Sequence, residues 1–320
     1  MVSSKIDGEP SLDFNLIMPS GSKNIKARIR AVRNIRKITK AMELVSAAKM
    51  RRAVGATLAS RPYAAASLTV LNDLAAVVDP SSHPYLFASG GAASRVLILV
   101  MTPDRGLCGN LTVEIFRRAD EFALTLAGQV ERIDYAVIGK KGAERMGRRG
   151  LNLVASFSKL SVIPTPDEFQ PIALFITKGF LEKQYDRVFL IYTDFISSLA
   201  RRATVHQLLP LTYSAELGAV SRRADEAADG ASRRAFAFVF EPGRDAVLSA
   251  ILPRLIETQL YQAMLESCAS EHSSRMVAMK NASDSAADIA DDLALAFNQM
   301  RQASITREIA EISAGKAVLE

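Results

Sequence analysis

The first part of the chain carries apolar residues at the spacing of an α-helix. From Ser22 to Asp79 these residues recur at steps of three and four. The stripe consists of Ile25, Ile29, Val32, Ile35, Ile38, Met42 and Val45, and it resumes with Leu68, Leu71, Leu74 and Val78. A turn-forming Asp-Pro-Ser-Ser sequence then ends it. The pattern predicts one long helix that has Ser22 as its N-cap and continues across Gly55 and Pro62.

The last part of the chain carries a seven-residue repeat between Asp245 and Ile312. Two series of positions, each spaced by seven, hold mainly apolar or small residues. The series are Leu255, Gln262, Ala269, Met276, Ser283, Ala290, Phe297 and Ser304, and Thr258, Leu265, His272, Met279, Ala286, Leu293 and Met300. A helix of about 70 residues is a rod on the order of 100 Å long. Because small residues contribute little burial, such a helix pair would depend on an enclosing partner.

The residues between the two predicted helices follow a different pattern. Arg95–Met101 is a continuous apolar run, as expected for a buried strand. Helical and strand-like stretches alternate after it. The helices are expected at Leu111–Leu126, Lys140–Arg148 and Asp167–Lys183, and the strands at Tyr135–Ile138, Leu153–Phe157, Arg187–Tyr192, Thr204–Leu211 and Ala235–Glu241. The polar stretch Glu216–Arg234 is expected to be an exposed loop.

Together these patterns predict an α/β protein with a Rossmann-like central domain inserted between long N- and C-terminal helices. Because the inserted domain brings the inner ends of the helices together, we expect them to pair as an antiparallel coiled coil. The expected divisions are a flexible N-terminal extension at 1–21, the N-terminal helix at 22–79, the α/β domain at 80–243 and the C-terminal helix at 244–320.

The composition is that of an ordinary folded chain, with 49% hydrophobic and 23% charged residues, which is enough apolar material for a core. No apolar run approaches the roughly 18 residues of a membrane-spanning helix, so membrane association is expected only through partners. Cys108 and Cys268 match no disulfide or metal spacing, which favours a reducing compartment. The first twenty residues resemble neither a secretory signal nor a transit peptide. We expect a flexible tail there, with Met18 as an alternative start.

Positive charge is concentrated at one end of the chain. Between Ser22 and Arg61 there are twelve Lys or Arg residues and one acidic residue, Glu43. Clusters such as Arg33–Lys40 suit phosphate backbones, but the segment has no aromatic residue for base stacking. Charge alone therefore leaves two interpretations open, namely binding to nucleic acid and contact with acidic protein surfaces.

The loop after Arg95–Met101 is the strongest candidate for a nucleotide site. It reads MTPDRGLCGN and places Gly106 and Gly109 before a predicted helix, where an anion can bind. However, its glycine spacing is not GxGxxG, and the GKKG turn at 139–142 lacks the GxxxxGK[ST] pattern. A nucleotide site is therefore not the favoured interpretation.

Other catalytic arrangements are also not favoured. Cys108 lies near Arg105, but a nucleophilic cysteine needs a histidine partner, and the three histidines are far from it in sequence. The acidic helix face at Asp284, Asp288, Asp291 and Asp292 is expected to be solvated, and no residue cluster has zinc spacing. The chain shows no catalytic constellation, which points to a structural or mechanical role.

Four stretches of sequence, in the same order and at similar separations, resemble those of the gamma subunits of F-type ATP synthases. Residues 34–52 read NIRKITKAMELVSAAKMRR, which resembles the family's N-terminal signature. Residues 104–109 read DRGLCG, which matches a central motif of the family. Residues 261–281 (YQAMLESCASEHSSRMVAMKN) and 301–319 (RQASITREIAEISAGKAVL) resemble its C-terminal helix. The resemblance covers residues 22–320.

The resemblance implies a rotor shaft that couples rotation of a membrane c-ring to the catalytic cycle of the β subunits and is not itself catalytic. It implies that the coiled coil stands inside a ring of three α and three β subunits, and that the α/β domain is a foot touching epsilon and the c-ring. It implies no cofactor and no nucleic acid. The expected location is peripheral, on the cytoplasmic face of a bacterial plasma membrane, or alternatively on the matrix side of the mitochondrial inner membrane.

Family roles carry over to particular positions. The expected contacts with the α/β ring are Lys40, Met42, Lys49, Arg51, Arg52, Arg301, Gln302, Thr306 and Glu308. The foot loop is expected to consist of Asp104, Arg105, Gly106, Cys108 and Gly109. Asn110 stands where the family usually has a second glycine, which would reduce backbone freedom there. Two rival interpretations remain: an α/β enzyme with a coiled-coil arm, which would bind ATP or RNA, and a static scaffold, which would not rotate.

Overall fold

A computed structural model describes residues 20–77, 79, 83–86, 95–157, 161–211, 241 and 243–319. Residues 1–19 of the predicted tail, the predicted loop Glu216–Arg234 and the predicted strand Ala235–Glu241, apart from its last residue, lie outside these ranges. The described residues divide into two units. One contains the chain up to Ala41 and from Lys280 onward, and the other is Met42–Met279.

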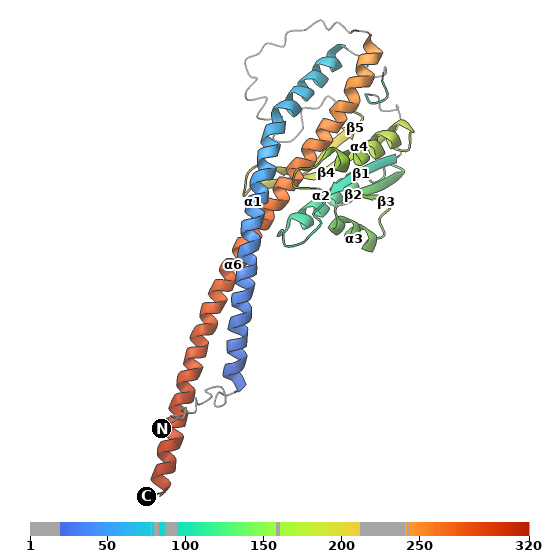
Figure 1. Cartoon of the computed structure of the whole chain (residues 1–320). Coiled ribbons are helices and arrows are strands. Elements are labelled where there is room, and N and C mark those ends of the chain that lie inside the picture. Colours follow the sequence, from blue (N-terminus) through green and yellow to red (C-terminus); the bar gives the residue numbers. More distant parts are fainter. Residues whose placement is uncertain are drawn as a thin grey trace, which may run out of the picture. The chain divides into compact units, whose positions relative to one another are not determined.

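The elements follow the predicted alternation of helices and strands (Figure 1). The helices are α1 Ser20–Val77, α2 Leu111–Leu126, α3 Lys140–Arg148, α4 Pro166–Leu181 and α6 Arg244–Leu319. The strands are β1 Arg95–Met101, β2 Arg132–Ile138, β3 Leu153–Phe157, β4 Arg187–Phe195 and β5 Arg201–Leu209. Both long helices are confirmed, and α1 includes Pro62 within its length. Within the described ranges no helix is long and apolar enough to cross a membrane.

The five strands form one sheet in the order β3-β2-β1-β4-β5. The first four are parallel, and β5 runs antiparallel to β4. From β1 the chain moves outward to β2 and β3 and then returns to the other side of β1 with β4. The strand order therefore reverses between β1 and β4, where doubly wound folds have their ligand crevice, outside the carboxyl ends of the strands.

Helices cover both faces of the sheet because the side chains of its strands alternate in direction. On β1, Val96, Ile98 and Val100 pack in a buried cluster with residues of α2 and α3. Leu97, Leu99 and Met101 belong to the opposite cluster, with residues of α4 and α6. Burying each of these aliphatic side chains stabilises the fold by about 1.5–3 kcal/mol. The α/β domain is thus built onto the C-terminal helix.

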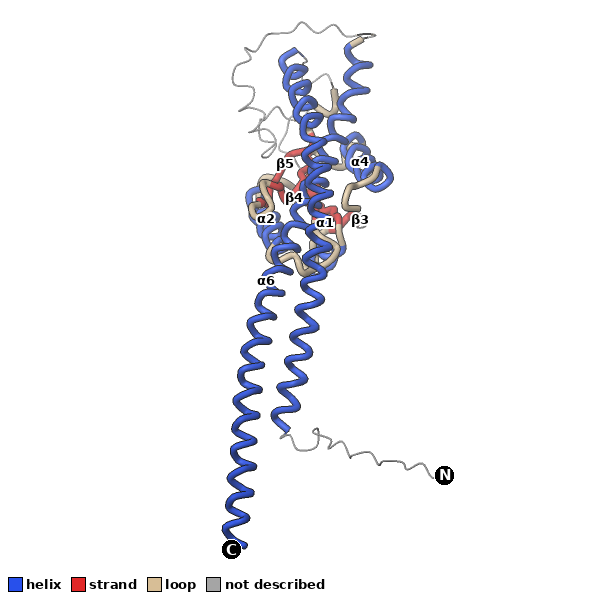
Figure 2. Tube along the Cα trace, turned by 60° about the vertical axis from the view of Figure 1, so that its left-hand side comes forward, coloured by secondary structure: helices blue, strands red, loops and turns tan. Residues whose placement is uncertain are grey.

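Within Met42–Met279, α6 also pairs with α1 (Figures 1 and 2). Ser60 Oγ donates a hydrogen bond to Gln262 Oε1 at 2.6 Å. Ala53 and Ala269, both fully buried, belong to one small cluster with Phe195 of β4. Ala53 lies seven residues before Ser60, and Ala269 lies seven residues after Gln262. The two helices therefore run antiparallel here, and each advances by seven residues between the two contacts.

The predicted apolar stripe of α1 is wrong as a description of its buried face. Ile29 is buried, but Ile35, Ile38 and Val45 are 52%, 60% and 55% exposed. Each step of three residues turns the helix about 60° short of a full turn, so three such steps carry Ile38 to the side opposite Ile29. The buried positions instead step by seven through Thr39, Ser46 and Ala53. The heptad series of α6 is better borne out, because its members from Leu255 to Ala290 are buried or half-buried.

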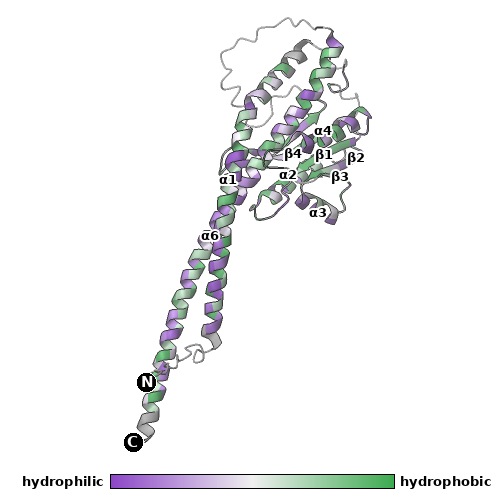
Figure 3. Ribbon diagram, viewed as in Figure 1, coloured by the Kyte–Doolittle hydropathy of each residue, from purple (hydrophilic) through white to green (hydrophobic). Residues whose placement is uncertain are grey.

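In the other unit, the segments 20–41 of α1 and 280–319 of α6 lie side by side and antiparallel in both views (Figures 1 and 2). Ser283, Ala286 and Ala290 of α6 are buried, as the heptad predicts. The last turns of α6 continue past the start of α1, and every described side chain from Arg301 on is exposed except Ser304. Figure 3 shows hydrophobic and hydrophilic residues mixed along both segments.

Candidate functional site

The predicted foot loop connects β1 to α2 and is tightly folded. Leu107 and Gly109 both have positive φ, 65° and 60°, so the backbone turns twice through the left-handed region within three residues. Leu107 adopts this conformation without the freedom of glycine and leaves its side chain 60% exposed. Asp104 Oδ1 accepts a hydrogen bond at 2.9 Å from the backbone nitrogen of Lys140, which starts α3. The loop is therefore joined to the next β–α connection.

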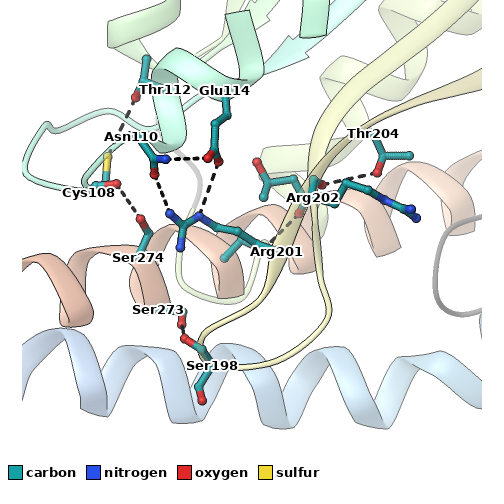
Figure 4. A network of polar contacts seen from close by, with 12 residues as sticks. Cys108, Asn110, Thr112, Glu114, Ser198, Arg201, Arg202, Thr204, Ser273 and Ser274 are labelled. Carbon is teal, nitrogen blue, oxygen red and sulfur yellow. Dashed lines mark hydrogen bonds and ion pairs between the residues drawn. The ribbon is translucent and has the colours of Figure 1, made fainter. Parts of the chain in front are cut away.

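Two neighbouring residues of α6 hold this loop through its backbone. Ser274 Oγ donates to the carbonyl oxygen of Cys108 (Figure 4). Arg275 donates to the carbonyl oxygens of Arg105 at 3.0 Å and Gly106 at 3.4 Å. Arg275 is itself oriented by Glu271, whose carboxylate lies 2.8 Å from its Nη1. Two motifs 166 residues apart, DRGLCG and SEHSSRM, thus meet in the structure.

A second set of contacts continues the loop toward β5 (Figure 4). Arg201 donates to Asn110 Oδ1 at 2.6 Å, and Asn110 Nδ2 donates to Glu114 Oε1, also at 2.6 Å. Asn110 has φ −85° and ψ −1°, a right-handed conformation open to any residue. Asn110 therefore fits this position without backbone strain, and the conformation does not need glycine. Ser273 of α6 also donates to the carbonyl oxygen of Ser198, in the β4–β5 connection.

These contacts place α6 in the crevice at the carboxyl ends of β1 and β4. Ser270 Oγ donates to the carbonyl oxygen of Thr193 on β4, while Ser274 holds the loop after β1. The hollow left beside Thr102 and Glu271 measures about 20 Å³. That volume suits one or two water molecules. The position at which a Rossmann fold holds a nucleotide is therefore filled by the protein's own helix.

The glycines of the GKKG turn have a packing role. A Cβ on Gly139 would lie 2.0 Å from the carbonyl oxygen of Thr102, and Gly139 has φ +95°. A Cβ on Gly142 would lie 2.5 Å from Thr102 Oγ1, to which the Gly142 backbone donates at 2.9 Å. Both positions therefore exclude any side chain, so that α3 can start against the end of β1. This accounts for the turn without a bound phosphate.

Cys108 is buried at the centre of the loop, as the sequence interpretation expected. Burial raises the pKa of its thiol, and Thr112 and Arg275 offset the rise only in part. Its sulfur lies 3.9 Å from both the Arg105 carbonyl oxygen and Thr112 Oγ1. A catalytic cysteine needs a lowered pKa, so this environment favours a packed thiol over a nucleophile.

The predicted contact residues of α1 span about three turns of that helix. Lys40, Arg51 and Arg52 are exposed, whereas Met42 and Lys49 are half-buried. The apolar side chains of Ile38, Leu44 and Val45 are exposed among them. Cationic and apolar side chains therefore share the outer surface of α1.

The predicted contact residues near the C-terminus lie in the last turns of α6. Arg301, Gln302, Thr306 and Glu308 are all exposed. Their neighbours include the exposed apolar residues Ile305, Ile309 and Ile312. The structure does not gather the predicted set into one site, because its members lie on α1, on the end of α6 and in the foot loop.

Sequence reasoning missed the residues that hold the foot loop. Ser274, Arg275 and Arg201 were not singled out, although the first two lie in a quoted motif. The hydrogen bonds of Ser274 and Arg275 go to backbone carbonyl oxygens, which carry no signal in the side-chain pattern, and Arg201 donates to the side chain of Asn110, 91 residues away in sequence. The polar Ser-Ser-Arg run inside a helix with a heptad repeat was the one sequence feature that could have indicated these contacts.

A small α/β domain fastened to a long helix, with apolar and basic side chains exposed along both long helices, defines the class of an assembly subunit. A family model described as ATP synthase matches residues 21–319. The ATP synthase gamma chain of Roseiflexus castenholzii is 41% identical over 94% of this chain and 99% of its own. That of Chloroflexus aurantiacus is also 41% identical, with the same coverage. The chain therefore belongs to the ATP synthase gamma chain family.

Solved structures agree with this assignment. The central stalk and c-ring structure of the Tetrahymena thermophila mitochondrial ATP synthase contains a chain that is 26% identical, with a TM-score of 0.56. The match covers 77% of this chain and 99% of that one. A chain of the Euglena gracilis mitochondrial ATP synthase rotor has a TM-score of 0.60 at 17% identity, covering 89% and 99%, and this supports the fold alone.

Proposed function

We propose that this chain is the rotor shaft of an F-type ATP synthase. In this role it transmits rotation of a membrane c-ring to the catalytic β subunits and has no catalytic site of its own. The observation that carries the proposal is the match with gamma chains over nearly the full length of both proteins. The α6-filled crevice agrees with it, because a shaft needs a rigid joint there and no nucleotide.

The shaft itself would be an antiparallel coiled coil of residues 22–79 and 244–320, with residues 80–243 as the foot and 1–21 as an extension. The pairs Ser60–Gln262 and Ala53–Ala269 support this, since both helices advance by seven residues between them. The buried positions are mostly small or polar, such as Thr39, Ser46 and Ser283. Such a seam contributes little burial, so the pair would gain stability from a surrounding ring.

The ring would consist of three α and three β subunits that grip the exposed rows of both helices. On α1 the row includes Lys40, Met42, Lys49, Arg51 and Arg52, and its excess of positive charge suits acidic loops of β. On α6 it includes Arg301, Gln302, Thr306 and Glu308. The exposed isoleucines beside them would turn against apolar walls of the ring.

The foot would contact the epsilon subunit and the c-ring, and the complex would hold the chain at the membrane without a span of its own. The foot loop Asp104–Gly109 is the proposed contact segment, with Leu107 as its exposed apolar tip. The hydrogen bonds from Ser274 and Arg275 to the loop backbone would transmit a force on this loop to α6. The bacterial relatives favour the cytoplasmic face of a plasma membrane over the mitochondrial matrix side.

Rotation in the reconstituted complex tests the proposal. A tagged chain is expected to co-purify with α, β and epsilon, and a bead tied to a cysteine introduced at exposed Leu199 should rotate when ATP is supplied. Assembly without rotation would favour the static scaffold. Failure of the tagged chain to bring α and β with it would overturn the assignment to this complex.

A further inference from the structure

A buried polar cluster lies where α1, α6 and the end of β4 meet. Glu266 of α6 is 1% exposed and Asp194 of β4 is fully buried. Arg61 Nη2 lies within 3.9 Å of Glu266 Oε1 and within 3.0 Å of the carbonyl oxygen of Phe195, the residue after Asp194, so the two carboxyl groups belong to one buried cluster. Burial, and after it the charge of Asp194, disfavours ionisation of Glu266. Two adjacent buried carboxylates would also repel each other strongly.

The guanidinium of one arginine balances one negative charge of the carboxyl pair. Arg61 of α1 places Nη2 3.9 Å from Glu266 Oε1 and donates from the same nitrogen to the carbonyl oxygen of Phe195 at 3.0 Å. Gln262 donates to Glu266 Oε1 at 2.9 Å and accepts from Ser60 of α1 at 2.6 Å. With one proton on the pair, two carboxyl groups and one guanidinium make an electrically neutral cluster. Without that proton the cluster carries a net negative charge in the protein interior, which is costly.

Other titratable or charged groups lie near the pair. On β4, Tyr192 is buried, and burial, with Glu266 and Asp194 next, raises the pKa of its phenol, so it stays neutral. On β5, Arg202 lies directly across from Asp194 in the strand register, but its side chain is exposed, so solvent weakens its charge. On α1 the charged group is Arg61, and on α6 the near neighbour Gln262 is uncharged.

We propose that Asp194 and Glu266 form a proton-binding site, which holds one shared proton and, with Arg61, fastens α1 to α6 and β4. Release of the proton leaves an unbalanced charge at this joint and weakens it. The site thus makes the attachment of α1 to the α/β domain dependent on pH. This property is separate from the proposed role as a shaft and is tested on the full chain alone.

The pH dependence of unfolding tests the site. Burial, followed by the charge of Asp194, raises the pKa of Glu266 to about 8, against 4.5 ordinarily. Between these values unfolding releases one proton, so stability falls as pH rises. Compared with Glu266→Gln, the wild-type unfolding constant should increase about tenfold per pH unit from about pH 5 to 8 and then level off. Glu257→Gln, on the partly exposed side of the same helix, should leave the wild-type profile unchanged.

Asp194→Asn provides an independent variant, since it removes the other carboxyl group of the pair and should abolish the same pH dependence. Carbon NMR of ¹³C-labelled glutamate in the wild-type chain should show one carboxyl resonance, absent from Glu266→Gln, that titrates near pH 8. The proposal would be overturned if the difference in unfolding free energy between wild type and each of the two variants did not change with pH. A Glu266 resonance that titrates near pH 4.5 would do so even if neither variant folds.

Discussion

Single residues of α6 determine how the foot loop is held. Ser274 and Arg275 donate to three backbone carbonyl oxygens of the loop, and Glu271 orients the guanidinium. Because the acceptors belong to the backbone, holding the loop does not engage its exposed side chains, such as Leu107. A buried acceptor that loses its donor costs more than the bond itself contributes.

Ser274→Ala should lower the free energy of unfolding by about 1 kcal/mol, because it removes one hydrogen bond and leaves the Cys108 carbonyl oxygen with only the long 3.4 Å bond from the Leu111 nitrogen. Urea unfolding of the full chain measures this. Ser285→Ala, at an exposed position of the same helix, is the matched control and should change stability by less than about 0.5 kcal/mol. Equal effects of the two substitutions would contradict the role given to Ser274.

The glycines of α3 allow an equally direct comparison. Gly139→Ala should destabilise the chain by about 2–4 kcal/mol, because the new Cβ meets the Thr102 carbonyl oxygen and φ is +95°. Gly147 lies in the same helix with open space around it, so Gly147→Ala should stabilise the chain by about 0.5–1 kcal/mol. Thermal unfolding checks this prediction, because the midpoint temperature should fall in Gly139→Ala and rise in Gly147→Ala.

At the scale of elements, the pairing of α1 with α6 depends on small residues at heptad positions. Ala53 is fully buried beside Ala269 and Phe195, and Ser60 reaches Gln262 by a hydrogen bond. The larger apolar side chains of α1, such as Leu44 and Leu58, are exposed. The element therefore has its inner and outer faces reversed relative to an ordinary amphipathic helix.

Ala53→Leu should destabilise the chain by about 1–3 kcal/mol through overpacking of this seam. Ala59→Leu, at an exposed position of the same helix, should change stability by less than about 0.5 kcal/mol. Denaturant midpoints of the two variants give the comparison. A tolerated leucine at position 53 would show that the helices do not pack closely there.

The contact between β5 and α6 should respond to acid. His206 is half-buried, and its Nε2 lies 3.1 Å from Gln259 Oε1. Burial lowers the pKa of His206 below its ordinary 6.5, and the hydrogen bond to Gln259 offsets this only in part. The unfolded chain then binds a proton that the folded chain does not, so stability falls as pH drops below about 6.5. His206→Gln should remove this fall, which unfolding curves from pH 7 to 5 would reveal as a difference between the two proteins.

At the scale of the whole molecule, the exposed rows on both long helices make sense only with surrounding subunits. Arg301 and Gln302 are exposed near the end of α6. Their proposed role is to grip a loop of β, so they should affect the complex and not the isolated chain.

The double variant Arg301→Ala/Gln302→Ala should lower coupled ATP synthesis and hydrolysis of the reconstituted complex about tenfold or more, since it removes charge-assisted bonds worth about 1.5–3 kcal/mol. Its unfolding curve as an isolated chain should match the wild type. Lys316→Ala, near the end of the same helix, serves as a control in the complex. Unchanged turnover in the double variant would refute the gripping role.

Much of the fold followed from sequence patterns. The runs at 95–101, 111–126, 140–148 and 153–157 have the bounds that were predicted, because each combines a clear period with a turn signal at its ends. The heptad of α6 predicted its buried face. The proposed shaft contacts and the foot loop came from motif resemblance, and the structure places them without testing their roles.

Two features were decided only by the tertiary structure. Ile35 and Ile38 are apolar side chains of the kind that a core contains, but both are exposed. The buried positions in this part of α1 are instead Thr39 and Ser46. The crevice of the sheet is filled because Ser270, Ser273 and Ser274 donate to carbonyl oxygens of β4 and of two connections far away in sequence. Periodicity is a local property and determined the helices and strands. Which face is buried, and which carbonyl meets which hydroxyl, depends on long-range packing that no local pattern encodes.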